Sequence, residues 1–232
     1  MDAALLAAVA TGDRKALSRA ISHAEAGEPS GDLALSHPII GFTGPPGAGK
    51  STLISVLIER FRKDGETVAV LAVDPSSPFT GGAILGDRIR MQAHVGDDGV
   101  FVRSMAARGH LGGLAVAAAD AVRLMGHAGY DRLIVETVGV GQSEVEVMDL
   151  ASHVVLVVGP SWGDQIQADK AGVVEIADLF VINKGDRPGV SDVKRALTEV
   201  ADARGAEIVV TTAIDGSGVD ELIAAIGRLH ET

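Results

Sequence analysis

The 232-residue chain is long enough for one sizeable α/β core, and its 47% hydrophobic content is ordinary for a globular protein. A net charge of −11 argues against a nucleic-acid partner, because proteins that bind phosphate backbones usually carry a basic field. The lack of cysteine excludes disulfides, thiolate metal sites and thiol catalysis. No run of about 18 apolar residues occurs, and Asp2 stands where a signal peptide would carry positive charge, so we expect a cytoplasmic protein with no membrane contact.

Strands and helices alternate along most of the chain. Residues 2–26 read as one or two amphipathic helices, followed by the linker GEPSGD. Apolar runs then predict seven strands, at 38–43, 67–73, 99–105, 132–137, 153–159, 179–184 and 207–212. Helical stretches lie near 51–63, 113–128, 190–204 and 218–230. This order predicts an α/β domain over 37–232, built on a mainly parallel sheet with helices on both faces, behind a helical extension over 1–36.

The sequence GPPGAGKS, residues 44–51, matches the phosphate-binding pattern G-x-x-x-x-G-K-[ST] between an apolar strand and an amphipathic helix. Its glycines permit the tight turn that points backbone N–H groups at phosphates, and the helix N-terminus adds a positive dipole. Lys50 is expected to reach the β- and γ-phosphates as a catalytic cation, and the Ser51 hydroxyl to ligate Mg²⁺. The nucleotide-binding residues predicted here are Gly44, Pro45, Pro46, Gly47, Ala48, Gly49, Lys50, Ser51 and Thr52.

A second motif predicts which base is bound. The stretch FVINKGD ends a strand with the N-K-x-D pattern, formed by Asn183, Lys184 and Asp186. An aspartate carboxylate accepts hydrogen bonds from N1–H and the 2-amino group of guanine, whereas adenine would leave it facing a lone pair. After one more helix, Thr212 and Ala213 are expected to brace the guanine edge. The pair of motifs therefore predicts a guanine nucleotide.

Glu136 closes the apolar run RLIVE, at the strand end where ligands of parallel sheets bind. A carboxylate there would hold Mg²⁺, directly or through water, and take part in catalysis. Asp74 and Asp87 supply two further carboxylates for the same metal and phosphate site, where Asp87 is also expected to be catalytic, and Gly139 would offer its N–H to the γ-phosphate. The alternative for Glu136 is a surface carboxylate that caps the helix after residue 143.

The combination of GFTGPPGAGKSTL, VDPSSPFTGGAILGDRIRM, IVETVGVGQSE and VINKGD resembles the MeaB/ArgK-type GTPases. These are SIMIBI-class P-loop proteins that act as G-protein chaperones of adenosylcobalamin-dependent acyl-CoA mutases such as methylmalonyl-CoA mutase. The resemblance implies hydrolysis of GTP to GDP with Mg²⁺, and a role in cofactor delivery to a mutase or in its protection. It also implies a mutase and its adenosyltransferase as partners, a homodimer, and Mg²⁺ surrounded by Asp74, Asp87 and Glu136.

Residues 163–172 resemble switch III of that family, which links the nucleotide state to the mutase. The resemblance assigns partner coupling to Asp164, Gln167 and Lys170. Without it, the stretch SWGDQIQADK is a polar loop and helix start that contains one exposed or half-buried tryptophan, Trp162.

Two other functions stay open from the residues. A small-molecule kinase would need an acceptor pocket and a lid, and no segment reads as either. A nickel-delivery GTPase of the same superfamily is disfavoured by the lack of cysteine and by seven histidines that are scattered along the sequence.

Overall fold

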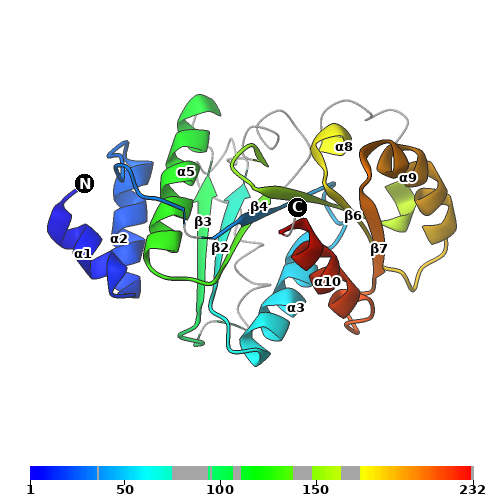
Figure 1. Ribbon diagram of the computed structural model, residues 1–232, viewed down its shortest axis with the longest axis horizontal. Coiled ribbons are helices and arrows are strands. Elements are labelled where there is room, and N and C mark those ends of the chain that lie inside the picture. The colour runs from blue at the N-terminus through cyan, green and yellow to red at the C-terminus, as the bar shows by residue number, and fades with distance from the viewer. Residues whose placement is uncertain are drawn as a thin grey trace.

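The structure, a computed structural model, describes residues 1–35, 37–74, 94, 96–106, 111–137, 148–162 and 173–230. Within these residues, seven parallel strands form one sheet in the order β3-β2-β4-β1-β5-β6-β7 (Figure 1). The strands are β1 Ile39–Thr43, β2 Val68–Asp74, β3 Val100–Ala106, β4 Arg132–Thr137, β5 His153–Val158, β6 Leu179–Asn183 and β7 Glu207–Thr211. The predicted α/β class and all seven predicted strands are confirmed.

Helices lie on both faces of this sheet. They are α1 Ala3–Ala10, α2 Arg14–Glu25, α3 Lys50–Lys63, α5 Leu111–His127, α8 Val173–Ile176, α9 Val190–Arg204 and α10 Val219–Leu229, with a 3₁₀ turn η2 at Pro160–Trp162. The first stretch forms two helices because Gly12, at φ +78°, ends α1, and the Asp13 carboxylate then caps α2 by accepting from the N–H groups of Lys15 and Ala16.

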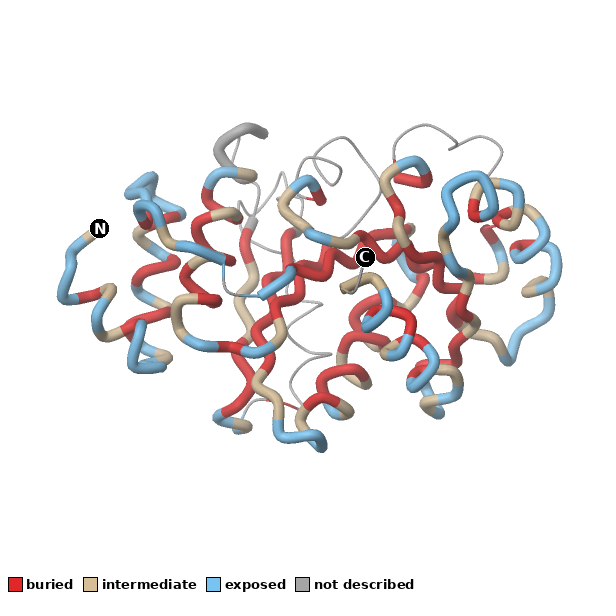
Figure 2. The backbone as a smooth tube through the Cα atoms, viewed as in Figure 1, coloured by how far each residue is buried: buried red, intermediate tan, exposed pale blue. Residues whose placement is uncertain are grey.

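The alternation of side chains along β5 shows how the two faces are covered. Val155 and Val157 are fully buried in the cluster that contains α3 and α10, whereas Leu156 and Val158 are fully buried against α8 and α9. On the α8 and α9 side of the sheet, α5 covers the strands at the other end, with α1 and α2 packed in the same cluster (Figure 1). Burial on both faces makes the inner strands β2, β4, β1, β5 and β6 nearly continuous buried segments in Figure 2, whereas the edge strands β3 and β7 include half-buried residues.

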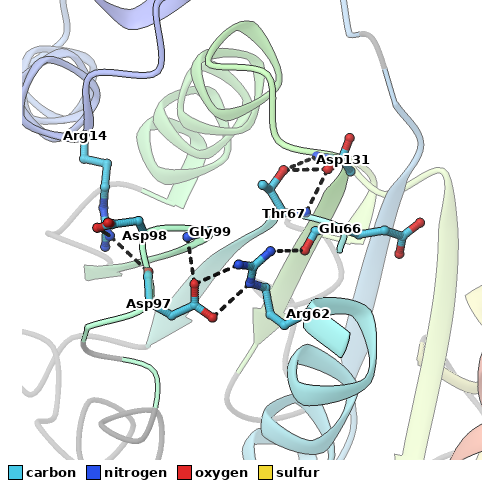
Figure 3. A network of polar contacts seen from close by, with 8 residues as sticks. All are labelled: Arg14, Arg62, Glu66, Thr67, Asp97, Asp98, Gly99 and Asp131. Atoms are coloured by element: carbon cyan, nitrogen blue, oxygen red, sulfur yellow. Dashed lines mark hydrogen bonds and ion pairs between the residues drawn. The ribbon is translucent and has the colours of Figure 1, made fainter. Parts of the chain in front are cut away.

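A network of polar contacts lies at the N-terminal ends of the strands (Figure 3). Arg62, in the last turn of α3, donates to both carboxylate oxygens of Asp97, at 2.9 and 3.0 Å, and to the carbonyl of Glu66 at 2.7 Å. Asp97 also accepts from the Gly99 N–H at 2.8 Å, and its carbonyl accepts from Arg14 of α2 at 3.1 Å. The hydrogen bonds from Arg62 lower the pKa of Asp97. The network thus ties the C-terminal end of α3 to the start of β3.

A pair of histidines also lies at the N-terminal ends of the strands. The rings of His153, which starts β5, and His230, which follows α10, have centroids 5.2 Å apart. Burial lowers the pKa of His230, and the neighbouring His153 and Arg132 add to this effect. No helix among the described residues is both long enough and apolar enough to span a bilayer.

Candidate functional site

The loop after β1 turns tightly enough that glycine is required at two positions. Gly44 has φ +136°, and a Cβ there would lie 2.0 Å from the Val157 carbonyl oxygen of β5. Gly49 has φ +96°, and its Cβ would lie 2.4 Å from the Asn183 side-chain nitrogen. An alanine at either position would therefore clash with β5 or with the end of β6. Because glycine has no Cβ, the loop can lie close to both strands.

Lys50 is the first residue of α3 and is buried, with 5% of its surface exposed. Its ammonium donates to the carbonyl oxygens of Gly44, at 2.6 Å, and Pro45, at 3.1 Å. The loop therefore surrounds the Lys50 ammonium, whose positive charge would stabilise an anionic phosphate chain bound in the loop.

Ser51 and Glu136 meet in the interior beside this lysine. The Ser51 hydroxyl donates to a Glu136 carboxylate oxygen at 2.6 Å, and Glu136 is fully buried. The pairing of β1 with β4, in register at Phe42 and Glu136, sets this contact. The alternative of a surface carboxylate is therefore wrong for Glu136. A hydroxyl and a carboxylate are hard oxygen donors, so the pair fits Mg²⁺.

Asn183 joins three loops at the carboxyl end of β6. Its amide nitrogen donates to the Ala48 carbonyl at 2.9 Å. Its oxygen accepts from the Thr211 hydroxyl at 3.2 Å and from the Ala213 N–H at 3.1 Å. Because Asn183 is buried at 2% exposure, these bonds have little competition from water. The phosphate-loop motif and the two base motifs are thus in direct contact.

Lys184 makes a second connection to the phosphate loop. Its ammonium donates to the Gly47 carbonyl at 2.6 Å. Among the described residues it is the only non-glycine with positive φ, at +63°, a conformation that costs energy for a side chain with a Cβ. The next residue, Gly185, donates its N–H to the Thr211 carbonyl at 2.9 Å, which holds the strained turn against β7. Asp186 is exposed at the rim of this turn.

The loop after β7 is a closed turn. Thr212 donates its N–H to the Ser217 carbonyl at 2.9 Å, and its own carbonyl accepts from the Gly216 N–H at 2.9 Å. The Asp215 carboxylate accepts from the Ser217 N–H at 2.8 Å, which lowers the pKa of Asp215. This turn fixes Thr212 and the buried Ala213 next to Asn183.

A cleft of about 710 Å³ opens beside the phosphate loop. Its walls are residues 45–48, residues 159–162, and Lys184, Arg187 and Pro188. Trp162 lines it but is 3% exposed and belongs to the core cluster of α8 and α9. The prediction of an exposed or half-buried tryptophan is therefore wrong, because distant apolar residues cover a side chain whose sequence neighbours are polar.

Several predicted site residues lie outside the described part of the chain. They are Asp87, Gly139, Asp164, Gln167 and Lys170. The backbone of Asp74 ends β2 beside β4, whose Thr137 is in register with Val73, but its side chain is not described. Among the described residues, no three His, Cys, Asp or Glu side chains form a metal-binding group. The structure therefore brings together Ser51 and Glu136, and the other metal ligands stay predictions.

Sequence patterns missed two features of the site. The contact of Lys184 with the phosphate loop joins residues 137 positions apart, so no local pattern signals it. Arg187 lines the cleft, and its only signal in the sequence is its place directly after Asp186.

The parallel sheet, the glycine loop around Lys50 and the base-motif loops held by Asn183 define a P-loop protein of the GTPase class. Residues 21–232 match the family described as Methylmalonyl Co-A mutase-associated GTPase MeaB. The chain belongs to this MeaB family of GTPases.

Individual relatives agree with the family match. A Pyrococcus horikoshii protein, whose name marks it only as a candidate GTPase, is 48% identical over 228 residues, covering 91% of this chain and 72% of the relative. GTPase ArgK of Escherichia coli is 41% identical over 197 residues, covering 81% of this chain and 60% of ArgK. The mouse protein Methylmalonic aciduria type A homolog, mitochondrial, is 42% identical over 164 residues, covering 71% of this chain and 40% of its own length.

Solved structures agree on the fold. A structure described as LAO/AO transport system kinase has a TM-score of 0.76 and 28% identity, and the match covers all of this chain and 76% of that one. Hydrogenase maturation factor HypB from Archaeoglobus fulgidus has a TM-score of 0.62 and 21% identity, over 97% of this chain and 99% of that one. The latter likeness is one of fold alone.

Proposed function

We propose that this GTPase is a Mg²⁺-dependent chaperone that gates cofactor delivery to an adenosylcobalamin-dependent acyl-CoA mutase, or protects that mutase. The family description and the name of the mouse relative support the client. The observation that carries the nucleotide part is the junction at Asn183, where the phosphate loop and both base motifs share one buried side chain. A nucleotide bound across these loops would contact all of them, so a shift in one loop would be passed to the others through Asn183.

In this proposal the phosphate chain of GTP lies along the loop over residues 44–51, and Lys50 turns from the loop carbonyls to the β- and γ-phosphates. Ser51 and Glu136 would hold Mg²⁺, and Asp74 and Asp87 would be further ligands. When bound, the ion would neutralise charge on the β- and γ-phosphate oxygens. The oxygen of a water molecule would bond to the γ-phosphorus as the bond between that phosphorus and the β–γ bridging oxygen breaks, which gives GDP and inorganic phosphate and releases one proton of the water to phosphate or solvent. Lys50 would stabilise the charge left on the β-phosphate.

Guanine recognition falls to the loops after β6 and β7. The Asp186 carboxylate would accept from the guanine N1–H and 2-amino group, while Thr212 and Ala213 brace the opposite edge. The strained turn at Lys184 supports this role, because it fixes the backbone next to the exposed Asp186, so that less of the loop would have to become ordered when the base binds.

The partner coupling is proposed for the segments after β4 and η2. Gly139 would contact the γ-phosphate, and Asp164, Gln167 and Lys170 would transmit the nucleotide state to the mutase. A homodimer, an adenosyltransferase as second partner and a cytoplasmic location complete the proposal.

A protection assay tests the chaperone role. A mutase encoded in the source genome is allowed to turn over with adenosylcobalamin, and its active lifetime is measured with this chain and GTP, with this chain and GDP, and alone. We expect GTP to extend the lifetime through the wild-type chain and through Arg195→Ala, whose exposed side chain lies on α9, but not through Lys50→Ala. Equal lifetimes in every mixture would refute the mutase role and leave the GTPase assignment intact.

A further inference from the structure

The charged residues that line the cleft beside the phosphate loop are all positive. Its only charged lining residues are Lys184 and Arg187, and no carboxylate lines it among the described residues. The chain as a whole carries a net charge of −11, which opposes the approach of a polyanion. The lining of this cleft therefore favours binding of an anion, although the chain as a whole is negatively charged.

The two cations differ in what they already contact. The Lys184 ammonium is held by the Gly47 carbonyl at 2.6 Å. The Arg187 side chain is exposed, and within the described residues its guanidinium makes no hydrogen bond or ion pair. In contrast, other arginines of the described chain are engaged with carboxylates, such as Arg62 with Asp97. Arg187 can therefore accept a ligand without breaking an existing contact.

The backbone that carries Arg187 is held in place. Its N–H donates to the Lys184 carbonyl at 3.0 Å, which closes a turn. The turn is fixed at Gly185 by the Thr211 carbonyl, 2.9 Å away, and through Asn183 to the phosphate loop. Because this backbone is already held, a ligand that binds Arg187 has to order the side chain but not the loop that carries it.

We propose that Arg187 is a nucleotide-binding residue, which contacts the phosphate chain of GTP or GDP from its place in the lining of the cleft. A guanidinium presents paired donors that match phosphate oxygens, and it is weakly hydrated. This inference rests on the proposed nucleotide site and adds to Lys50 a second cation that contacts the phosphate chain. Arg187 is then an affinity determinant that no part of the phosphate-loop motif supplies.

Binding measurements by calorimetry test the proposal with GTP, GDP and guanosine as probes. Arg187→Ala should weaken GTP and GDP binding about tenfold at low salt, the loss expected for one hydrogen bond to a charged group, and leave guanosine binding unchanged. The loss should shrink toward 1 M salt, where the screening length falls to about 3 Å. Arg187→Lys should keep part of the affinity because the charge stays and the paired donors are lost.

Two comparisons make the outcome decisive. Arg195→Ala removes an exposed arginine of α9 and should leave all three affinities unchanged. Equal weakening of guanosine and GTP by Arg187→Ala would place the side chain at the base and overturn the phosphate contact, as would unchanged GTP affinity. If Lys50→Ala weakens GTP binding while Arg187→Ala does not, this inference alone fails; if neither variant matters, the nucleotide site itself is misplaced.

Discussion

Replacing Asn183 with alanine should damage both the fold and the nucleotide site. The substitution removes the donor to the Ala48 carbonyl and the acceptor for the Thr211 hydroxyl and the Ala213 N–H. Asn183 is 2% exposed, so water cannot readily replace these bonds. An unsatisfied buried polar group costs about 1–3 kcal/mol, and two backbone groups lose their partner. The Thr211 hydroxyl can rotate to another acceptor.

We therefore expect Asn183→Ala to lower the free energy of unfolding by about 3–5 kcal/mol, a large part of the ~5–15 kcal/mol that typical domains have. Urea denaturation monitored by circular dichroism measures the loss. GTP affinity should fall as well, because the phosphate loop and the base loops are no longer held together.

Thr211→Val is the matched control, since it removes only the 3.2 Å bond from the hydroxyl to Asn183 and keeps the shape of the side chain. It should cost about 1 kcal/mol, and the double variant should lose less than the sum of the two single losses. A loss below about 1 kcal/mol for Asn183→Ala, or strict additivity with Thr211→Val, would refute the shared junction.

Four further substitutions test the phosphate loop, the base contact and the pH dependence of stability. Gly44→Ala should abolish nucleotide binding, because its Cβ meets a carbonyl oxygen at 2.0 Å, whereas Gly47→Ala, with φ +77° and no atom within 4 Å, should cost only about 1–2 kcal/mol of unfolding free energy. Asp186→Asn should shift preference from GTP to XTP in a turnover assay, and retained GTP preference would contradict the base assignment. Burial lowers the pKa of His230, so the unfolded chain takes up the proton first and stability should fall as the pH drops below about 6.5. His230→Phe should flatten this fall in melting temperature, and an unchanged pH profile would show that the histidine is not responsible.

The strands and long helices were predictable because each is marked by a local pattern. The run VVLVV of β5 is apolar throughout, as a strand buried on both faces must be, and α9 lies at 190–204 as predicted. The four residues of α8 were not predicted, since one turn is too short to show a helical period. Trp162 was misjudged for a related reason, because its burial depends on α8 and α9 rather than on its neighbours in sequence.

The candidate site divides in the same way. The glycine loop and the N-K-x-D pattern are short motifs with fixed spacing, so the sequence reveals them. The bond from Asn183 to the Ala48 carbonyl spans 135 residues and becomes visible only when β1 and β6 lie in one sheet. The histidines, which look scattered in sequence, include His153 and His230 with adjacent rings. The roles of Asp74 and Asp87 at the metal stay predictions.

We propose that binding to an acyl-CoA mutase changes the rate of GTP hydrolysis by this chain. The most direct test is the rate of GTP turnover by the purified chain, alone and with each adenosylcobalamin-dependent mutase encoded in the source genome, with ATP as the control nucleotide. We predict slow hydrolysis of GTP alone, none of ATP, and a severalfold rise in the GTP rate with one particular mutase. A GTP rate that no mutase changes would contradict the account.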